Sequence, residues 1–348
     1  MEDIQRICTT EEKLMTRLFA TPILIVLVAF FQQVEAQSQH PAILQLRSTI
    51  PLPHVQGRID HMDIDLKTQR VFVAALANNT VEVVSLREGK RTRTLDGFKE
   101  PQGVLYLPEL NQLYITGGGD GTCAILDATS FKRFKTIESL EDADNIRYDR
   151  SSKLVYVAYG SGGLAIIDPS KSETRYLLPL TQHPESFQIE NSGNRIYVNV
   201  PNEKKIVVFD KAKRETVASW SVKDADKNYP MALDEQHRLL FVGCRTPARL
   251  LVLDTGSGKV ISTIPIAGDV DDVFFDAQRH LLYVSCGEGV IDVFSQETPN
   301  SYKRVERVPT RTGARTCVLV TSLNMLLVAV PQNGFEDAQL RVYSINNP

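Results

Sequence analysis

A short apolar run with an aromatic residue or leucine at its centre recurs seven times along the chain, and polar turns separate the runs. Successive centres are 42, 42, 41, 44, 42 and 44 residues apart. We call these central residues the anchors; they are Phe72, Tyr114, Tyr156, Tyr197, Phe241, Tyr283 and Leu327. Such constant spacing is typical of a repeat architecture built from one supersecondary unit.

Each repeat has the same internal plan. An apolar strand begins about 11 residues before the anchor, and a polar turn such as residues 149–152 leads into the anchor strand. A Gly- or Asn-rich hairpin then precedes a third strand with alternating pattern, such as 81–86, and a variable fourth strand, such as 259–266. Four strands without a helical period form one antiparallel blade. The sequence therefore predicts an all-β fold, a seven-bladed β-propeller of four-stranded antiparallel blades.

The seventh repeat has only three strands, near 315–320, 325–330 and 338–345. The segment Ile43–Pro51 contains the sequence Ser-Thr-Ile-Pro, which also occurs in the fourth strand of the fifth repeat. We therefore expect this N-terminal segment to complete the last blade beside residues 340–342. Ring closure would protect a strand edge that otherwise promotes aggregation.

The N-terminus has the pattern of a secretory signal peptide. Leu18–Phe31 is a run of 14 uncharged residues that follows Lys13 and Arg17, and small residues precede a cleavage point after Ala36. A membrane anchor is the alternative, but 14 helical residues span only ~21 Å of a ~30 Å hydrocarbon core. We expect residues 1–36 to be the signal peptide, with Met15 as an alternative start.

Residues 37–348 are then expected to form a single propeller domain, periplasmic or secreted, without a membrane span after cleavage. Composition agrees with an ordinary globular protein, since 43% of residues are hydrophobic and the net charge is −3. No long block of like charge supports binding of nucleic acid. The four cysteines beyond residue 36 form no C-x-x-C pair, so we expect small buried side chains. We expect a monomer.

The anchor runs also carry a family resemblance. VFVA, LYIT, VYVA, IYVN, LFVG and LYVS resemble the Y-V-T-N repeat, and LDTGSGKVISTI (253–264) resembles the linker that follows it in YncE-type propellers. The Trp-Asp pairs of WD-repeat propellers are absent from the sequence. The resemblance covers nearly all of residues 37–348 and implies a secreted, extracytoplasmic bacterial propeller. It implies nothing definite about activity, because the functions of that family are mixed.

The loops that enter the first strand of each repeat differ sharply although the anchor strands are alike. At 12 residues before the anchor, four of the seven residues are carboxylates. Carboxylates that lie close together raise one another's pKa or require a cation. We expect these loops to meet at one mouth of the central tunnel and to supply ligand-binding residues: Arg58, Asp60, His61, Asp144, Asn145, His183, Glu185, Tyr229, Asp271, Asp272 and Arg315.

A structural explanation of these residues stands beside the functional one. Aspartate and asparagine are favoured at strand-entry turns because their side chains accept hydrogen bonds from nearby backbone N–H groups. A propeller tunnel is also expected to be wet and polar. Single aspartates and single histidines therefore carry less weight than the set of entry loops taken together.

Two functions remain open. The first, which we favour, is a binding or scaffold protein that holds a small ligand, an ion or a protein partner at the polar mouth, because no nucleophile is evident. The alternative is a metal-dependent hydrolase or lyase of lactonase type. In it, a divalent ion, the one candidate cofactor, would be held by ligands drawn from Asp60, His61, Asp144, Glu185 and Asp271. His61 or His183 would be the catalytic base, and Arg58 or Arg315 would bind a substrate carboxylate.

Overall fold

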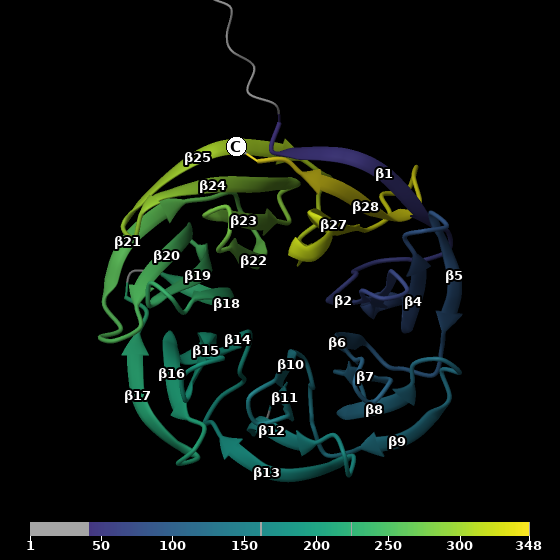
Figure 1. Cartoon of the computed structure of the whole chain (residues 1–348), viewed down its shortest axis with the longest axis horizontal. Coiled ribbons are helices and arrows are strands. Elements are labelled where there is room, and N and C mark those ends of the chain that lie inside the picture. Colours follow the sequence, from purple (N-terminus) through teal and green to yellow (C-terminus); the bar gives the residue numbers. More distant parts are fainter. Residues whose placement is uncertain (1–41, 161, 224, 348) are drawn as a thin grey trace, which may run out of the picture. The chain divides into compact units, whose positions relative to one another are not determined.

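The computed structural model describes residues 42–160, 162–223 and 225–347. Seven four-stranded antiparallel sheets form a closed ring around a central tunnel (Figure 1), which confirms the predicted seven-bladed β-propeller. The expected signal peptide lies outside the described residues. Among the residues described, no helix has the length and apolar character needed to cross a membrane.

The strands of each blade are numbered from the tunnel outward. Blade 1 contains β2 (Met62–Asp65), β3 (Arg70–Ala75), β4 (Thr80–Ser85) and β5 (Lys90–Leu95). Blade 2 contains β6 (Pro101–Leu107), β7 (Gln112–Gly117), β8 (Thr122–Asp127) and β9 (Arg133–Ile137). Blade 3 contains β10 (Ile146–Asp149), β11 (Leu154–Tyr159), β12 (Gly163–Asp168) and β13 (Glu173–Pro179). Blade 4 contains β14 (Phe187–Ile189), β15 (Arg195–Val200), β16 (Lys205–Asp210) and β17 (Glu215–Ser221).

The remaining blades follow the same order. Blade 5 contains β18 (Asp226–Asp234), β19 (Leu239–Thr246), β20 (Ala248–Asp254) and β21 (Val260–Pro265). Blade 6 contains β22 (Val270–Asp276), β23 (Leu281–Cys286), β24 (Val290–Thr298) and β25 (Ser301–Pro309). Blade 7 contains β26 (Thr316–Val320), β27 (Met325–Val330), β28 (Ala338–Ile345) and, outermost, β1 (Leu44–Leu52). Three single-turn 3-10 helices, η1 (Leu76–Asn78), η2 (Pro201–Glu203) and η3 (Thr321–Leu323), replace simple hairpin turns or connect strands.

The N-terminal strand closes the ring as predicted. β1 pairs antiparallel with β28, with Thr49 opposite Arg341 and Ile50 opposite Leu340. Ile50 and Leu52 are almost fully buried against apolar residues of blades 1 and 7. Pairing between the two ends of the described chain therefore completes blade 7 and closes the ring.

The hydrophobic core is divided into layers between neighbouring blades. Between blades 1 and 2, for example, Phe72 and Val83 pack against Val104 and Ile115. The second strand of each blade is therefore buried on both faces, which explains the nearly continuous apolar anchor runs. These layers hold the backbone of every inner strand in a fixed position.

Turn aspartates occupy the end of the blades opposite the entry loops. Asp65, Asp149, Asp234 and Asp276 each lie seven residues before an anchor and accept hydrogen bonds from backbone N–H groups of the turn. These four carboxylates stabilise the turn between the first and second strands. The aspartates at this end of the molecule thus have the structural role expected of aspartate in turns.

Candidate functional site

The entry loops converge at one end of the tunnel because backbone hydrogen bonds hold each loop at the same height. Asp60, Asp144 and Glu185 each donate their backbone N–H to the carbonyl of the residue two positions after the anchor, over 2.7, 3.0 and 2.9 Å. In each case that same second-strand residue donates back to the residue after the acid. The side chains at this level are therefore presented by rigid backbone rather than by free loops.

A connected set of charged side chains results, which we call the charged mouth. It contains seven carboxylates, three arginines, two histidines and one tyrosine. Its residues are Arg58, Asp60, His61, Asp142, Asp144, His183, Glu185, Tyr229, Arg245, Asp269, Asp271, Asp272 and Arg315.

The arginines of the charged mouth are all paired. Arg58 lies 2.8 Å from Asp60, and Arg245 lies 2.5 Å from Asp271. Arg315 lies 3.1 Å from Asp271 and 2.8 Å from Asp269, which also faces Arg245 at 3.3 Å. Asp271 thus faces two arginines at close range, and Arg58 approaches it to 3.9 Å.

Tyr229 belongs to the arginine side of the mouth. The guanidinium of Arg245 lies over its ring, 4.3 Å from the centroid, which is a cation–π contact. The sequence suggested an entry loop here, but β18 already begins at Asp226 and carries Tyr229 within a strand. The reason is a longer hairpin, because β19 continues to Thr246 and pairs with this added segment.

Among the described residues, no arginine lies at ion-pair distance from the carboxylates on the other side of the mouth. Asp144, His183 and Glu185 lie together, with one possible ligand atom of each within 4.8 Å of the others. His183 Nε2 is 3.7 Å from Glu185 Oε1, and His183 Nδ1 is 3.3 Å from Asp142 Oδ2. Of the metal candidates expected from sequence, the structure gathers Asp144 and Glu185 with His183, and it places Asp60 and Asp271 against arginines.

His61 lies between the two sides of the mouth. Its Nε2 is 3.6 Å from Asp60 Oδ1 and 3.8 Å from Asp144 Oδ1, and its Nδ1 is 4.0 Å from Asp272 Oδ1. Burial and the nearby Arg147 guanidinium lower the pKa of His61 to about 4. The imidazole is therefore neutral at pH 7 and able to accept a proton or a metal ion.

Burial raises the pKa of five carboxylates at the mouth: Asp60, Asp144, Glu185, Asp271 and Asp272. For Asp144 and Glu185, loss of hydration is the main cause, and neighbouring carboxylates raise the pKa further. For Asp60 and Asp271, the same effect of burial on the pKa is partly offset by the arginines. Asp60 Oδ1 and Asp144 Oδ1 are buried without a hydrogen-bond partner among the described residues.

Asp272 and Asn145, two further sequence candidates, have structural partners. Asp272 Oδ2 accepts the backbone N–H of Cys317 in blade 7 at 2.7 Å. The amide oxygen of Asn145 accepts a hydrogen bond from Arg147, which lies deeper in the tunnel. Asp272 thus has a structural role between blades 6 and 7, whereas Asn145 pairs with a side chain two residues further along its own segment.

Asp142, Asp269 and Arg245 belong to the mouth but were not selected from the sequence. Asp142 and Asp269 lie 14 residues before their anchors, the position at which Arg58 and His183 were selected. A comparison of the residue 14 positions before the anchor in all seven repeats would have selected both acids. Arg245 lies at the end of a second strand, where comparison of entry loops gives no signal.

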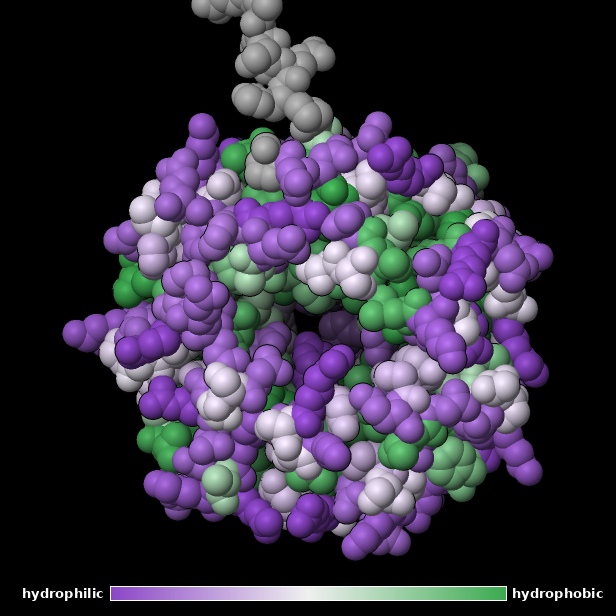
Figure 2. Space-filling model, viewed as in Figure 1, coloured by the Kyte–Doolittle hydropathy of each residue, from purple (hydrophilic) through white to green (hydrophobic). Residues whose placement is uncertain are grey.

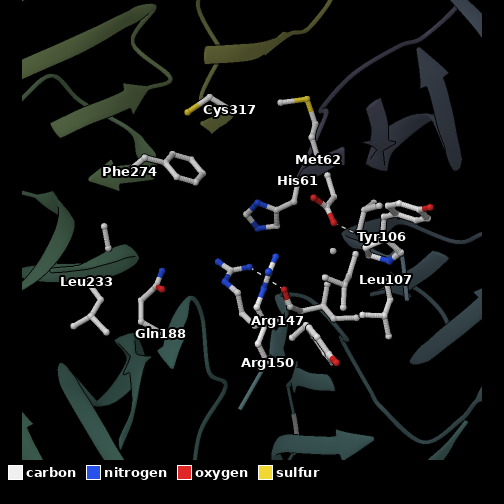
Figure 3. Close-up of a pocket in the computed structure, with 18 of the residues that line it drawn as sticks. His61, Met62, Tyr106, Leu107, Arg147, Arg150, Gln188, Leu233, Phe274 and Cys317 are labelled. Carbon is white, nitrogen blue, oxygen red and sulfur yellow. Dashed lines mark hydrogen bonds between the residues drawn. The ribbon is translucent and has the colours of Figure 1, made fainter. Parts of the chain in front are cut away.

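His61 also lines a pocket of about 430 Å³. Figure 3 shows His61 and Arg147 facing this cavity, with Phe274 and Tyr106 on its walls. In the face drawn in Figure 2 the ring is hollowed at its centre, and both hydrophilic and hydrophobic residues border the opening. The wall is mixed in character, since Leu107 and Leu233 line the cavity beside Arg150.

Comparison with known proteins supports the fold and gives no information on function. No protein-family model matches the chain, and no curated protein matches its sequence. Among solved structures, a chain in the crystal structure of the mitotic checkpoint complex is similar, with a TM-score of 0.72 and 13% sequence identity. The match covers 95% of this chain and 99% of that chain. At this identity the likeness shows a shared propeller fold alone.

Proposed function

We propose that this protein is a binding protein that holds a small, positively charged ligand, an ion or an amine, at the charged mouth. The observation that carries the proposal is the excess of acid there: seven carboxylates face three arginines, and every arginine is already paired. A rigid ring of inner strands supports these side chains. Pre-organised charge of this kind lowers the cost of ordering the site when a ligand binds.

The sign of the ligand's charge follows from the carboxylates left without an arginine. Asp144 and Glu185 are buried next to other acids, and burial first, with the neighbouring acids second, raises the pKa of both. A bound cation would take the place of those protons. An anionic ligand would have to displace an aspartate from an arginine.

A metal-dependent hydrolase or lyase of lactonase type is the second candidate. The observation that favours it is the position of His61, whose ring Nε2 lies close to Asp60 and Asp144 at the mouth, although a pKa of about 4 makes this imidazole a weak general base. We favour the binding function over the catalytic one because binding needs only the charge and shape already described. Catalysis needs, in addition, a substrate carbonyl placed beside that imidazole.

The family and the location also belong to this proposal. The Y-V-T-N-like anchors support placement among YncE-type propellers, and the apolar run at Leu18–Phe31 supports export to the periplasm or the medium. Both rest on the sequence. A small extracytoplasmic ligand or a protein partner would then meet the mouth outside the cytoplasm.

Calorimetric titration of the purified protein tests the proposed function. The probes are Zn²⁺, Mn²⁺, Ca²⁺, choline and spermidine, each added to wild type and to Asp271→Asn. Loss of one negative charge beside the site should weaken cation binding by roughly 3- to 10-fold. Glu215→Gln, which removes an equal charge from the exposed strand β17, should leave the affinity unchanged. If none of the five probes binds wild type, the proposal fails.

A further inference from the structure

Three potential metal ligands meet at the boundary between blades 3 and 4. Asp144 lies two residues before β10, and His183 and Glu185 lie four and two residues before β14. Donors about 2.1 Å from a tetrahedral ion lie roughly 3.4 Å apart. The 3.7 Å separation of His183 Nε2 and Glu185 Oε1 is close to this value, and Asp144 lies within 4.8 Å of both.

The ring of His183 is held in an orientation that suits a metal ligand. Its Nδ1 faces Asp142 Oδ2 at 3.3 Å, and Gln102 Nε2 donates to the other oxygen of Asp142 at 3.2 Å. This leaves Nε2 facing Glu185, and Asp144 completes the group of three possible ligands. Histidines that bind metals usually donate their second ring nitrogen to a carboxylate in this way, which fixes the tautomer and the ring plane.

Two glycines make room for this arrangement. A Cβ at Gly118 would lie 2.1 Å from Gln102 Nε2, and a Cβ at Gly160 would lie 2.8 Å from His183 Nδ1. Both distances are too short for any other residue unless the side chains move. The backbone of blades 2 and 3 thus permits Gln102, Asp142 and His183 to lie in line.

An independent observation indicates that something positive is needed here. Asp144 is only 7% exposed, and its Oδ1 has no hydrogen-bond partner among the residues described. The nearest basic group is His61 Nε2, at 3.8 Å. A buried carboxylate oxygen without a partner is costly, and a cation satisfies it more completely than a neutral imidazole beyond hydrogen-bond distance.

We propose that Asp144, His183 and Glu185 bind a divalent transition-metal ion, with Asp142 and Gln102 orienting His183. This inference rests on the proposed function and names the cation. One imidazole and two carboxylates suit Zn²⁺ or Mn²⁺ better than Ca²⁺ or Mg²⁺, which prefer oxygen ligands alone. Three protein ligands leave coordination positions open for water or for a second ligand that enters the mouth.

The experiment is calorimetric titration of chelator-treated protein with Zn²⁺, Mn²⁺, Ca²⁺ and Mg²⁺, with Co²⁺ absorption as a spectroscopic readout. Wild type should bind Zn²⁺ or Mn²⁺ at one site, more tightly than Ca²⁺ and Mg²⁺. His183→Ala and Glu185→Gln should each weaken that binding at least 100-fold. Asp142→Asn, which loosens the orientation of His183, should weaken it about 10- to 100-fold.

His237→Ala is the matched control. Its Nδ1 also pairs with an aspartate, Asp234, at 2.7 Å, but it lies in the turn between β18 and β19. This variant should bind the metal as wild type does, and thermal melts check that each variant is folded. Unchanged Zn²⁺ and Mn²⁺ binding by folded His183→Ala and Glu185→Gln would overturn the metal site. If wild type binds choline, spermidine or Ca²⁺ but neither transition metal, the metal site fails and the proposed function stands.

Discussion

At the scale of single residues, Asp63 of β2 should control part of the pH dependence of stability. Its carboxylate accepts backbone N–H groups of Tyr106 and Ile64, yet burial raises its pKa to about 6. The folded protein therefore holds this proton more tightly than the unfolded chain. The contribution to stability is complete below about pH 4 and is lost as the pH rises through about 6, by on the order of 2–3 kcal/mol.

Urea unfolding at pH 4, 5 and 6.5 measures this effect in wild type and in Asp63→Asn. The loss of one hydrogen-bond acceptor changes the variant's free energy of unfolding by an amount that does not depend on pH, and the pH-dependent contribution of Asp63 is removed as well. Its slope between pH 4 and 6.5 should be less negative than that of wild type. Parallel curves would show that Asp63 has an ordinary pKa in the folded protein.

Residues of the charged mouth could be predicted from sequence where a repeat position was compared across all blades. Comparison at 12 residues before the anchor selects Asp60, Asp144, Glu185, Asp271 and Arg315, which the ring does bring together. The division into an arginine side and a histidine side could not be predicted. It depends on which side chains face one another across the tunnel, and a single sequence holds no information on those distances.

At the scale of elements, β1 should contribute to stability through its buried face. Ile50 is 1% exposed and Leu46, in the same strand, is 48% exposed. Ile50→Ala should therefore lower the free energy of unfolding by roughly 2–4 kcal/mol, because it leaves a cavity between blades 1 and 7. Leu46→Ala should change it by less than about 0.5 kcal/mol. Equal effects of the two substitutions in urea unfolding would contradict the observed register.

Deletion of the segment that contains β1 tests whether the ring needs its closing strand. Deletion of residues 37–52 should leave β28 as an unpaired edge, and the protein should elute as aggregates in size-exclusion chromatography. Soluble, monomeric protein after this deletion would show that the ring does not need its closing strand.

Strand positions followed well from the sequence because each anchor run is buried on both sides. The segment expected at 338–345 is β28 with the same bounds, and the one expected at 259–266 is β21, Val260–Pro265. The 3-10 turns were not foreseen, since their sequences, such as Leu76–Asn78, resemble ordinary hairpins. The long β18 was missed because its added pairing comes from an extension of β19.

At the scale of the whole molecule, the charge of the mouth is a local property. If the chain is cut after Ala36, its formal net charge is −1, whereas the charged mouth holds seven carboxylates and three arginines. The remaining surface therefore carries a small excess of base. Such a distribution gives no long-range attraction for cations, and selection must occur by close contact inside the mouth, where screening by salt is weak.

The four thiols of the described residues should be unreactive in the folded protein, whichever compartment holds it. Cys123, Cys244, Cys286 and Cys317 are free and buried, and burial raises the pKa of each thiol. They should therefore stay reduced and unreactive even in an oxidising compartment. A thiol-alkylating reagent should modify none of them in the native protein and all four after unfolding.

The same sample identifies the mature N-terminus. Protein recovered from the periplasm or the medium should begin at or near Gln37, and its intact mass should rise by four alkyl groups after unfolding. A chain that keeps its first residues from Met1 also keeps Cys8 and would gain five. A chain that begins at Met15 would gain four but would be heavier by residues 15–36. Either of these masses, found on protein in the cytoplasm, would refute export, because signal peptidase acts only on chains that have crossed the membrane.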